Sequence, residues 1–407
     1  MEKLLDYGTD FTENAWEALY GAVDDSYFQT EDAALIYQAL EQRLKYIPFG
    51  VFLRRYIYRR AELDRPFDEV PLSDYQEIIR DSFADNAAPS SFEPTTAKLS
   101  AMTKKWLTQQ TVSRKVVFLL GFGLGMSVED VNAFLTKALR EQEINAKDPF
   151  EAICWYCFKK GLRYSRFEAL RGQYLAAPPR RSQEEALYSD MTIGVRDTLY
   201  AVDNDEALIR YLSRLKTRDN APRMSVSARR SFDELLRQAK TLVATLYNRE
   251  AENTISKAAQ RKDRLRVYST EDITEGDLER MISSAIPVDK HGNLTPSKAS
   301  KLNAQFAGKR FSRQHISEIL NGKAEVTRFD LITLNFFVFS LSLDDYPNSK
   351  SRYVAFIEST NRILSRCLFG DLYITNPYEC FILMCILSDD PLGTYADVWE
   401  LSYREDV

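Results

Sequence analysis

The chain has 407 residues, a length that predicts two or three domains, and it contains few glycines (15) and prolines (14). Hydrophobic residues make up 44% and aromatic residues 12%, which excludes a disordered or collagen-like chain. The net charge of −5 excludes a uniformly basic nucleic-acid coat, and the presence of only two histidines excludes a histidine-rich metal site.

No part of the sequence has the pattern of a secreted or membrane protein. The N-terminus carries acidic residues early and lacks the apolar core of a signal peptide. No apolar run reaches the ~18 residues that a membrane-spanning helix needs. The five cysteines lie among apolar neighbours, as expected of buried thiols in a reducing compartment. We therefore expect a cytoplasmic protein without membrane contact.

Stretches rich in proline, serine, asparagine or glycine predict loops at 86–95, 176–182, 217–227 and 287–297. Between these loops, apolar residues recur at three- and four-residue spacing, which predicts helices throughout. The expected fold class is therefore all-α and multi-helical. Cutting the chain at the loops gives an N-terminal helical domain, a first helical module, a central helical segment and a second helical module: residues 1–90, 91–180, 181–290 and 291–407.

Three sequence blocks of the first module reappear in the same order in the second module. The first and last pairs each include a helix start with a good N-cap residue, and the last pair adds proline at the first helical position. We infer a duplication, in which two related helical modules flank the central segment. The matched blocks are Val112-Ser113-Arg114 with Val326-Thr327-Arg328, residues 119–131 with 333–346, and Asp148-Pro149-Phe150-Glu151 with Asn376-Pro377-Tyr378-Glu379.

The second module contains the stretch FSRQHISEILNGK at 311–323. This stretch resembles the recognition helix and exit turn of lambda-repressor-like (Cro-type, XRE) helix-turn-helix domains, and the resemblance extends over 297–346. The first module keeps a partial second copy around 112–135, where LGMSVEDV is similar to the second half of the motif. The resemblance implies a capped helix whose first residues face the major groove, followed by an Asn-Gly turn and a core helix. Two residues depart from the family pattern, because Arg310 stands at the usual turn glycine and Phe306 at a usual small residue.

The residue types of this stretch agree with a DNA-reading helix. Ser312 is a good N-cap, and apolar residues at 316, 319 and 320 form a stripe for the core. Arginine suits guanine and glutamine suits adenine in the major groove. The expected base-reading residues are Arg313, Gln314, His315 and Ser317. The expected phosphate contacts are Lys301, Lys309, Arg310, Ser312 and Lys323.

Local charge supports this interpretation. Residues 295–325 contain six lysines and arginines against two glutamates, a net charge of +4 within a chain of −5. Such an asymmetry is typical of a surface that faces phosphates.

No catalytic constellation, metal-ligand cluster or cofactor motif is found in the sequence, so we expect neither enzymatic activity nor a cofactor. Cys154 and Cys157 form a C-x-x-C inside an apolar helix and are expected to be structural. The predicted function is sequence-specific binding of double-stranded DNA by a bacterial or mobile-element transcriptional regulator. The protein could form a homodimer, or bind a protein through its N-terminal or central helices. The alternative is a helical protein-interaction scaffold without DNA binding.

Overall fold

The computed structural model describes residues 33–38, 40, 47–93, 95–178, 198–216, 223–257, 267–282, 302, 306, 311–342, 346–374 and 376–402. Within these residues every secondary-structure element is helical, which confirms the all-α class. None of the helices in these ranges is long and apolar enough to cross a membrane.

The first half of the described chain contains α2 (Ala33–Gln38), α3 (Phe49–Arg60), η4 (Phe67–Glu69), α4 (Leu72–Asp85), α5 (Leu99–Trp106), α6 (Arg114–Gly123), α7 (Val128–Ala133), the π-helical turn η5 (Phe134–Ala138), α8 (Pro149–Lys159), α9 (Tyr164–Ala176) and α11 (Asp205–Arg214). The second half contains α12 (Arg223–Lys257), η6 (Thr270–Asp272), α13 (Glu275–Ile282), α15 (Arg313–Leu320), α16 (Arg328–Ser340), α17 (Ser349–Arg366), α18 (Pro377–Leu387) and α19 (Pro391–Leu401).

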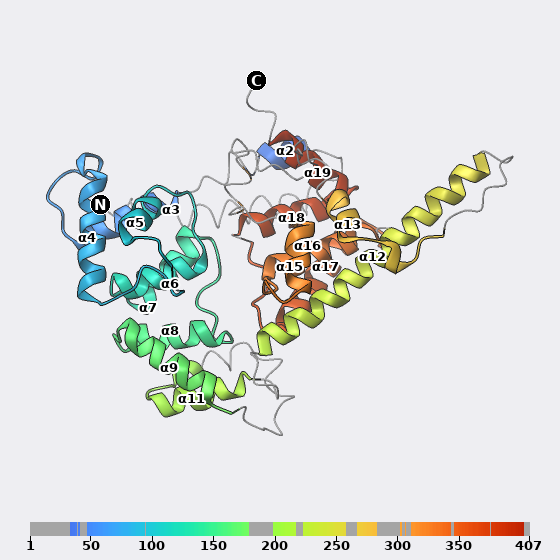
Figure 1. Cartoon of the computed structure of the whole chain (residues 1–407). Coiled ribbons are helices and arrows are strands. Elements are labelled where there is room, and N and C mark those ends of the chain that lie inside the picture. Colours follow the sequence, from blue (N-terminus) through green and yellow to red (C-terminus); the bar gives the residue numbers. More distant parts are fainter. Residues whose placement is uncertain are drawn as a thin grey trace.

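Buried side chains form two separate hydrophobic cores, so the described chain has two helical bodies (Figure 1). The core of the N-terminal body runs from Phe49 to Leu212 and takes in α3 to α11. The core of the C-terminal body takes in α12 to α19 and, from the other end of the chain, α2. The long helix α12 packs along α16 and extends beyond the C-terminal body in Figure 1.

These cores divide the chain at other places than the predicted domain boundaries. Helices on both sides of residue 90 share one core, and α2 belongs to the other. The predicted central segment 181–290 is split, because α11 joins the N-terminal body and α12 and α13 join the C-terminal body. An apolar stripe shows that a helix face is buried, but it does not show which helix covers that face.

Each body is built around helices that are apolar on nearly every side. Every residue of α18 is buried, and so are nearly all residues of α8 and α16. In the N-terminal body α6 packs closely on α4, since a Cβ atom at Gly123 would lie 1.9 Å from the Phe83 ring. The matched sequence blocks therefore supply central core helices of both bodies.

The two bodies meet at a pair of matching corners. Arg140 and Leu368 both adopt left-handed backbone conformations, with φ of 55° and 62°. The carbonyl of Leu368 accepts a hydrogen bond from Asn145 Nδ2 at 3.1 Å, and the carbonyl of Arg140 accepts one from Asn376 Nδ2 at 3.2 Å. Gln142 Nε2 adds a third bond to the carbonyl of Asp371 at 2.5 Å. These contacts place the starts of α6 and α16 on either side of one cavity.

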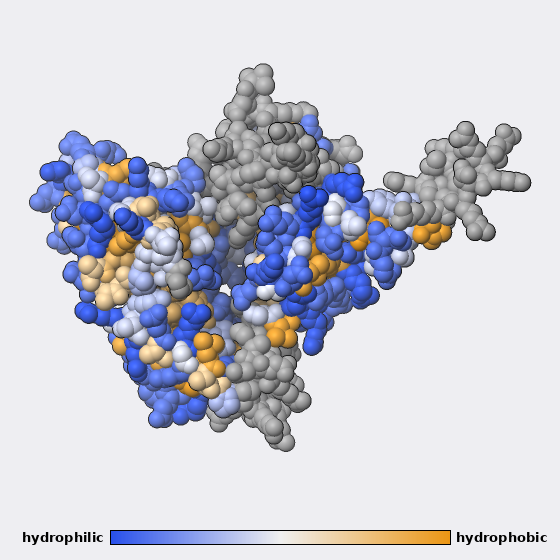
Figure 2. All heavy atoms as spheres, in the orientation of Figure 1, coloured by the Kyte–Doolittle hydropathy of each residue, from blue (hydrophilic) through white to orange (hydrophobic). Residues whose placement is uncertain are grey.

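Among the residues that are coloured in Figure 2, hydrophilic ones cover most of the visible face, with hydrophobic ones between them.

Candidate nucleic-acid interface

The helix predicted to follow Ser312 is present as α15, and the local sequence explains its bounds. The Ser312 side chain accepts a hydrogen bond from the backbone N–H of His315, which confirms the predicted N-cap. Ile316 and Ile319 are fully buried, whereas Leu320, expected in the same stripe, is 36% exposed. Leu320 is the last residue of the helix, where the chain turns away from the core. Gly322 then has φ of 69°, a conformation that glycine adopts without strain.

The outward face of α15 carries three of the four predicted base-reading residues. Arg313, Gln314 and Ser317 are exposed, and Lys323 is exposed just beyond the helix. Gln314 Nε2 donates a hydrogen bond to Glu318 Oε1 at 2.9 Å along the helix surface. These polar side chains therefore lie on the solvent face of α15, opposite its buried Ile316 and Ile319.

His315, the fourth predicted base-reading residue, is half-buried and turned toward α16. Its Nε2 lies 3.0 Å from Oδ1 of Asp330, which is fully buried. This hydrogen bond to Asp330 raises the pKa of His315 above its ordinary value. Asp330 also closes a capping box at the start of α16, since its Oδ2 accepts from the backbone N–H of Thr327 at 2.8 Å. The histidine therefore links α15 to the first turn of α16.

Both ends of α15 are held by side chains from other helices. At its start, the backbone N–H of Arg313 donates to Glu279 Oε1 of α13 at 3.1 Å, and its Nε lies 3.9 Å from Glu279 Oε2. At its end, Arg229 of α12 donates to the carbonyls of Ile319 and Leu320, the latter at 3.2 Å. No sequence signal pointed to Glu279 or Arg229, because both contacts join segments distant along the chain.

Three of the predicted phosphate contacts, Lys301, Lys309 and Arg310, lie outside the described residues. Ser312 is engaged as the helix cap, and Lys323 is exposed. Phe306, where the resemblance implies a small residue, is buried and stacks on Phe381 with ring centroids 5.4 Å apart. The C-terminal core therefore accommodates the bulky residue by ring packing.

An arginine at the start of α16 holds the loop that precedes α18. Arg328 forms a bidentate ion pair with Glu379, with Nε–Oε1 of 2.6 Å and Nη2–Oε2 of 2.7 Å. The same guanidinium donates to the carbonyls of Gly370 and Asp371. Glu379 Oε2 also accepts the backbone N–H of Tyr373 at 2.6 Å. One ion pair thus fixes a helix start, a loop and a second helix start.

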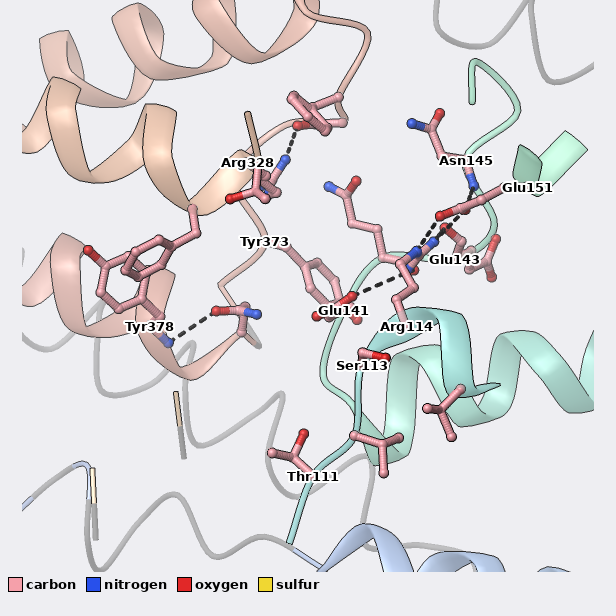
Figure 3. Close-up of a pocket in the computed structure, with 18 of the residues that line it drawn as sticks. Thr111, Ser113, Arg114, Glu141, Glu143, Asn145, Glu151, Arg328, Tyr373 and Tyr378 are labelled. Atoms are coloured by element: carbon pink, nitrogen blue, oxygen red, sulfur yellow. Dashed lines mark hydrogen bonds and ion pairs between the residues drawn. The ribbon is translucent and has the colours of Figure 1, made fainter. Parts of the chain in front are cut away.

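The N-terminal body contains the same arrangement at the start of α6 (Figure 3). Arg114 forms a bidentate pair with Glu151, at 2.6 and 2.8 Å, and donates to the carbonyls of Gln142 and Glu143. Glu151 Oε2 accepts the backbone N–H of Asn145 at 2.7 Å. The matched sequence blocks therefore make matched contacts. The two arginines and the two glutamates lie in the matched sequence blocks, but the sequence did not predict that each arginine pairs with a glutamate.

The helix ahead of α6 differs from α15. It is α5, and it begins at Leu99 without a side-chain cap hydrogen bond. Ser113, predicted to cap α6, also makes no capping hydrogen bond. The first body thus has α6 as the counterpart of α16, and its α5 lacks the capped start of α15.

Known proteins were compared with the whole chain. No protein-family model, no curated protein and no solved structure matches it.

The described residues include no group of three or more His, Cys, Asp or Glu side chains that could hold a metal ion. Cys154 and Cys157 are buried inside α8, as predicted for structural thiols. Burial raises the pKa of the Cys157 thiol to about 12 and that of Cys154 well above its ordinary value. Such thiols are poor nucleophiles at neutral pH.

Proposed function

We propose that the protein binds double-stranded DNA in a sequence-specific manner through α15, as a transcriptional regulator of a bacterium or of a mobile element. One observation carries the proposal: α15 is capped by Ser312, buried along Ile316 and Ile319, and polar on its exposed face. A helix of this kind fits the major groove, which is about 12 Å wide.

The chemistry of the exposed face assigns a role to each residue. Arg313 would donate to the O6 and N7 atoms of guanine, and Gln314 would pair with the N6 and N7 atoms of adenine. Ser317 lies one helical turn further along the same face and would contact a neighbouring base or phosphate. Lys323 would hold a phosphate beside the exit turn. His315 would position the helix instead of reading a base, because its ring is engaged by Asp330.

The contacts around α15 support this role. Glu279, Arg229 and Asp330 fix the start, the end and the inner face of the helix from three different helices. A helix held in this way presents its side chains in one orientation, so that little conformational entropy is lost on binding.

Fluorescence anisotropy with a labelled random-sequence duplex tests the proposal at low salt, where non-specific binding is strongest. We expect the full chain to bind, and the double variant Arg313→Ala/Lys323→Ala, which removes two exposed cations at and beside α15, to bind about tenfold more weakly. The matched control is Arg171→Ala, which removes an exposed arginine from α9 in the other body. Absence of binding at low salt would favour the protein-interaction scaffold. Binding that is insensitive to the double variant would exclude α15 as the interface.

A further inference from the structure

A cavity of about 660 Å³ lies between the two bodies, beside the starts of α6 and α16 (Figure 3). Arg114 and Arg328 flank it from opposite sides, and Tyr373 lies between them. Its volume is within the range of pockets that bind small molecules, about 300–1,000 Å³.

Apolar side chains from both bodies form much of the wall. Trp106 and Ile332 are almost fully buried, so this part of the wall is firmly packed into the two cores. Aromatic and aliphatic walls favour a ligand that is itself apolar and contains rings. The apolar residues of the wall include Met102, Trp106, Val116, Phe329, Ile332 and Phe369.

Two arginine–glutamate pairs line the cavity, beside the further charged residues Lys105, Glu141, Glu143 and Asp148. Arg114 is paired with Glu151 and Arg328 with Glu379, each in a bidentate geometry, and both guanidiniums also donate to backbone carbonyls. A ligand that displaced Glu151 or Glu379 from its arginine would leave a buried charge unpaired, at a cost of several kcal/mol. The hydroxyl groups of Thr111, Ser113 and Tyr373 offer neutral hydrogen bonds at the wall instead.

From the apolar wall and the paired charges we infer that the cavity is a binding site for a neutral, largely apolar, ring-containing small molecule. The cavity is connected to α15 through the first turn of α16. Thr327, Arg328 and Phe329 line the cavity, and the same turn of α16 carries Asp330, which bonds His315. A ligand that moves this turn therefore changes the support of α15. This last consequence rests on the proposed function, whereas the binding site itself does not.

The neutral dye Nile red tests the site on the full chain without DNA. We expect saturable binding of one dye per chain, read from the rise in dye fluorescence. Val116→Trp places a large side chain into the cavity from its wall, and Gln109→Trp does so from an exposed position at its rim. Each variant should bind the dye about tenfold or more weakly. Leu175→Trp is the matched control, since Leu175 is 56% exposed on α9 and outside the cavity lining. Circular dichroism shows whether each variant is folded. If Val116→Trp does not fold, dye binding by Gln109→Trp tests the site.

Equal dye affinity in wild type and both cavity variants would overturn the site, and so would the absence of saturable binding. Tighter binding of the anionic dye anilinonaphthalene sulfonate, lost in the same variants, would overturn the neutral ligand class.

The link to α15 is tested by amide hydrogen exchange of residues 313–320, which also needs no DNA. A dye concentration that saturates the wild type should change these exchange rates by about threefold or more in the wild type. The same concentration should leave the exchange rates of Gln109→Trp unchanged. Unchanged exchange in the wild type would overturn the link. Because neither readout uses DNA, failure of the cavity inference and failure of the DNA-binding proposal are distinguishable.

Discussion

Replacement of Arg328 by alanine should destabilise the C-terminal body strongly. The guanidinium makes two ion-pair contacts with Glu379, at 2.6 and 2.7 Å, and further hydrogen bonds to the carbonyls of Gly370 and Asp371. The Glu379 side chain is only 5% exposed, so its carboxylate has little access to water once the arginine is gone.

The magnitude follows from this burial. Removing one partner of a buried ion pair costs about 3–5 kcal/mol, because the other charge is left uncompensated. The Arg328 side chain is 19% exposed, which lets some solvent reach the site, so we expect a loss of about 3 kcal/mol. Adding Glu379→Met to Arg328→Ala should recover about half of that loss, since the buried charge is then removed. Arg328→Lys should be intermediate, because an ammonium keeps the charge but not the bidentate geometry.

Urea unfolding followed by circular dichroism measures these free energies on the full chain. Arg362→Ala, at an exposed position of α17, is the control and should change the free energy of unfolding by less than about 0.5 kcal/mol. A loss below about 1 kcal/mol for Arg328→Ala, or no recovery in the double variant, would refute the reasoning.

Three further substitutions have definite expected outcomes. Burial raises the pKa of Asp148 to about 7, so its charge opposes folding as the pH rises from about 4 to 7. Asp148→Asn should therefore raise the free energy of unfolding at pH 8 by an amount on the order of 1 kcal/mol. A lower free energy of unfolding in this variant at pH 8 would count against this. The hydrogen bond to Asp330 raises the pKa of His315, so the stability that this bond contributes is present below pH 6.5 and is lost as the pH rises through the higher folded pKa. In His315→Gln the melting temperature should fall less over that pH range than in the wild type. An equal fall in melting temperature would contradict the assignment. Glu279→Gln removes the carboxylate near the Arg313 guanidinium. Because a negative charge is lost there, the variant should bind random duplex about two- to fivefold more tightly in the anisotropy assay. Weaker binding by a folded variant would instead show that Glu279 serves to orient Arg313.

Local features of the fold could be predicted from the sequence because the interactions that make them span only a few residues. The caps of α15 by Ser312 and of α16 by Thr327 are confirmed, as is the Asn376-Pro377 start of α18. Ser113 shows the limit of this reasoning, since a favourable cap residue does not ensure that the bond is made.

The support of α15 could not be predicted, because it depends on the packing of distant segments. Arg229 reaches the end of α15 from 90 residues away along the chain, and Glu279 reaches its start from 34 residues away. Helical spacing placed His315 beside its exposed neighbours, and only the position of α16 reveals that its ring bonds Asp330. For the same reason the two cores, which are defined by contacts between helices, cross the predicted domain boundaries.

The most direct test of sequence-specific reading by α15 is to select preferred duplexes with the full chain and then to measure how single variants bind them. The proposed roles predict that Gln314→Ala flattens the preference at one base position, at about 1–3 kcal/mol. They predict that Lys323→Ala weakens all sequences equally and lowers the slope of log affinity against log salt by about 1. Failure to select any preferred duplex, or a preference that Arg313→Ala and Gln314→Ala both leave unchanged, would contradict DNA reading by this helix.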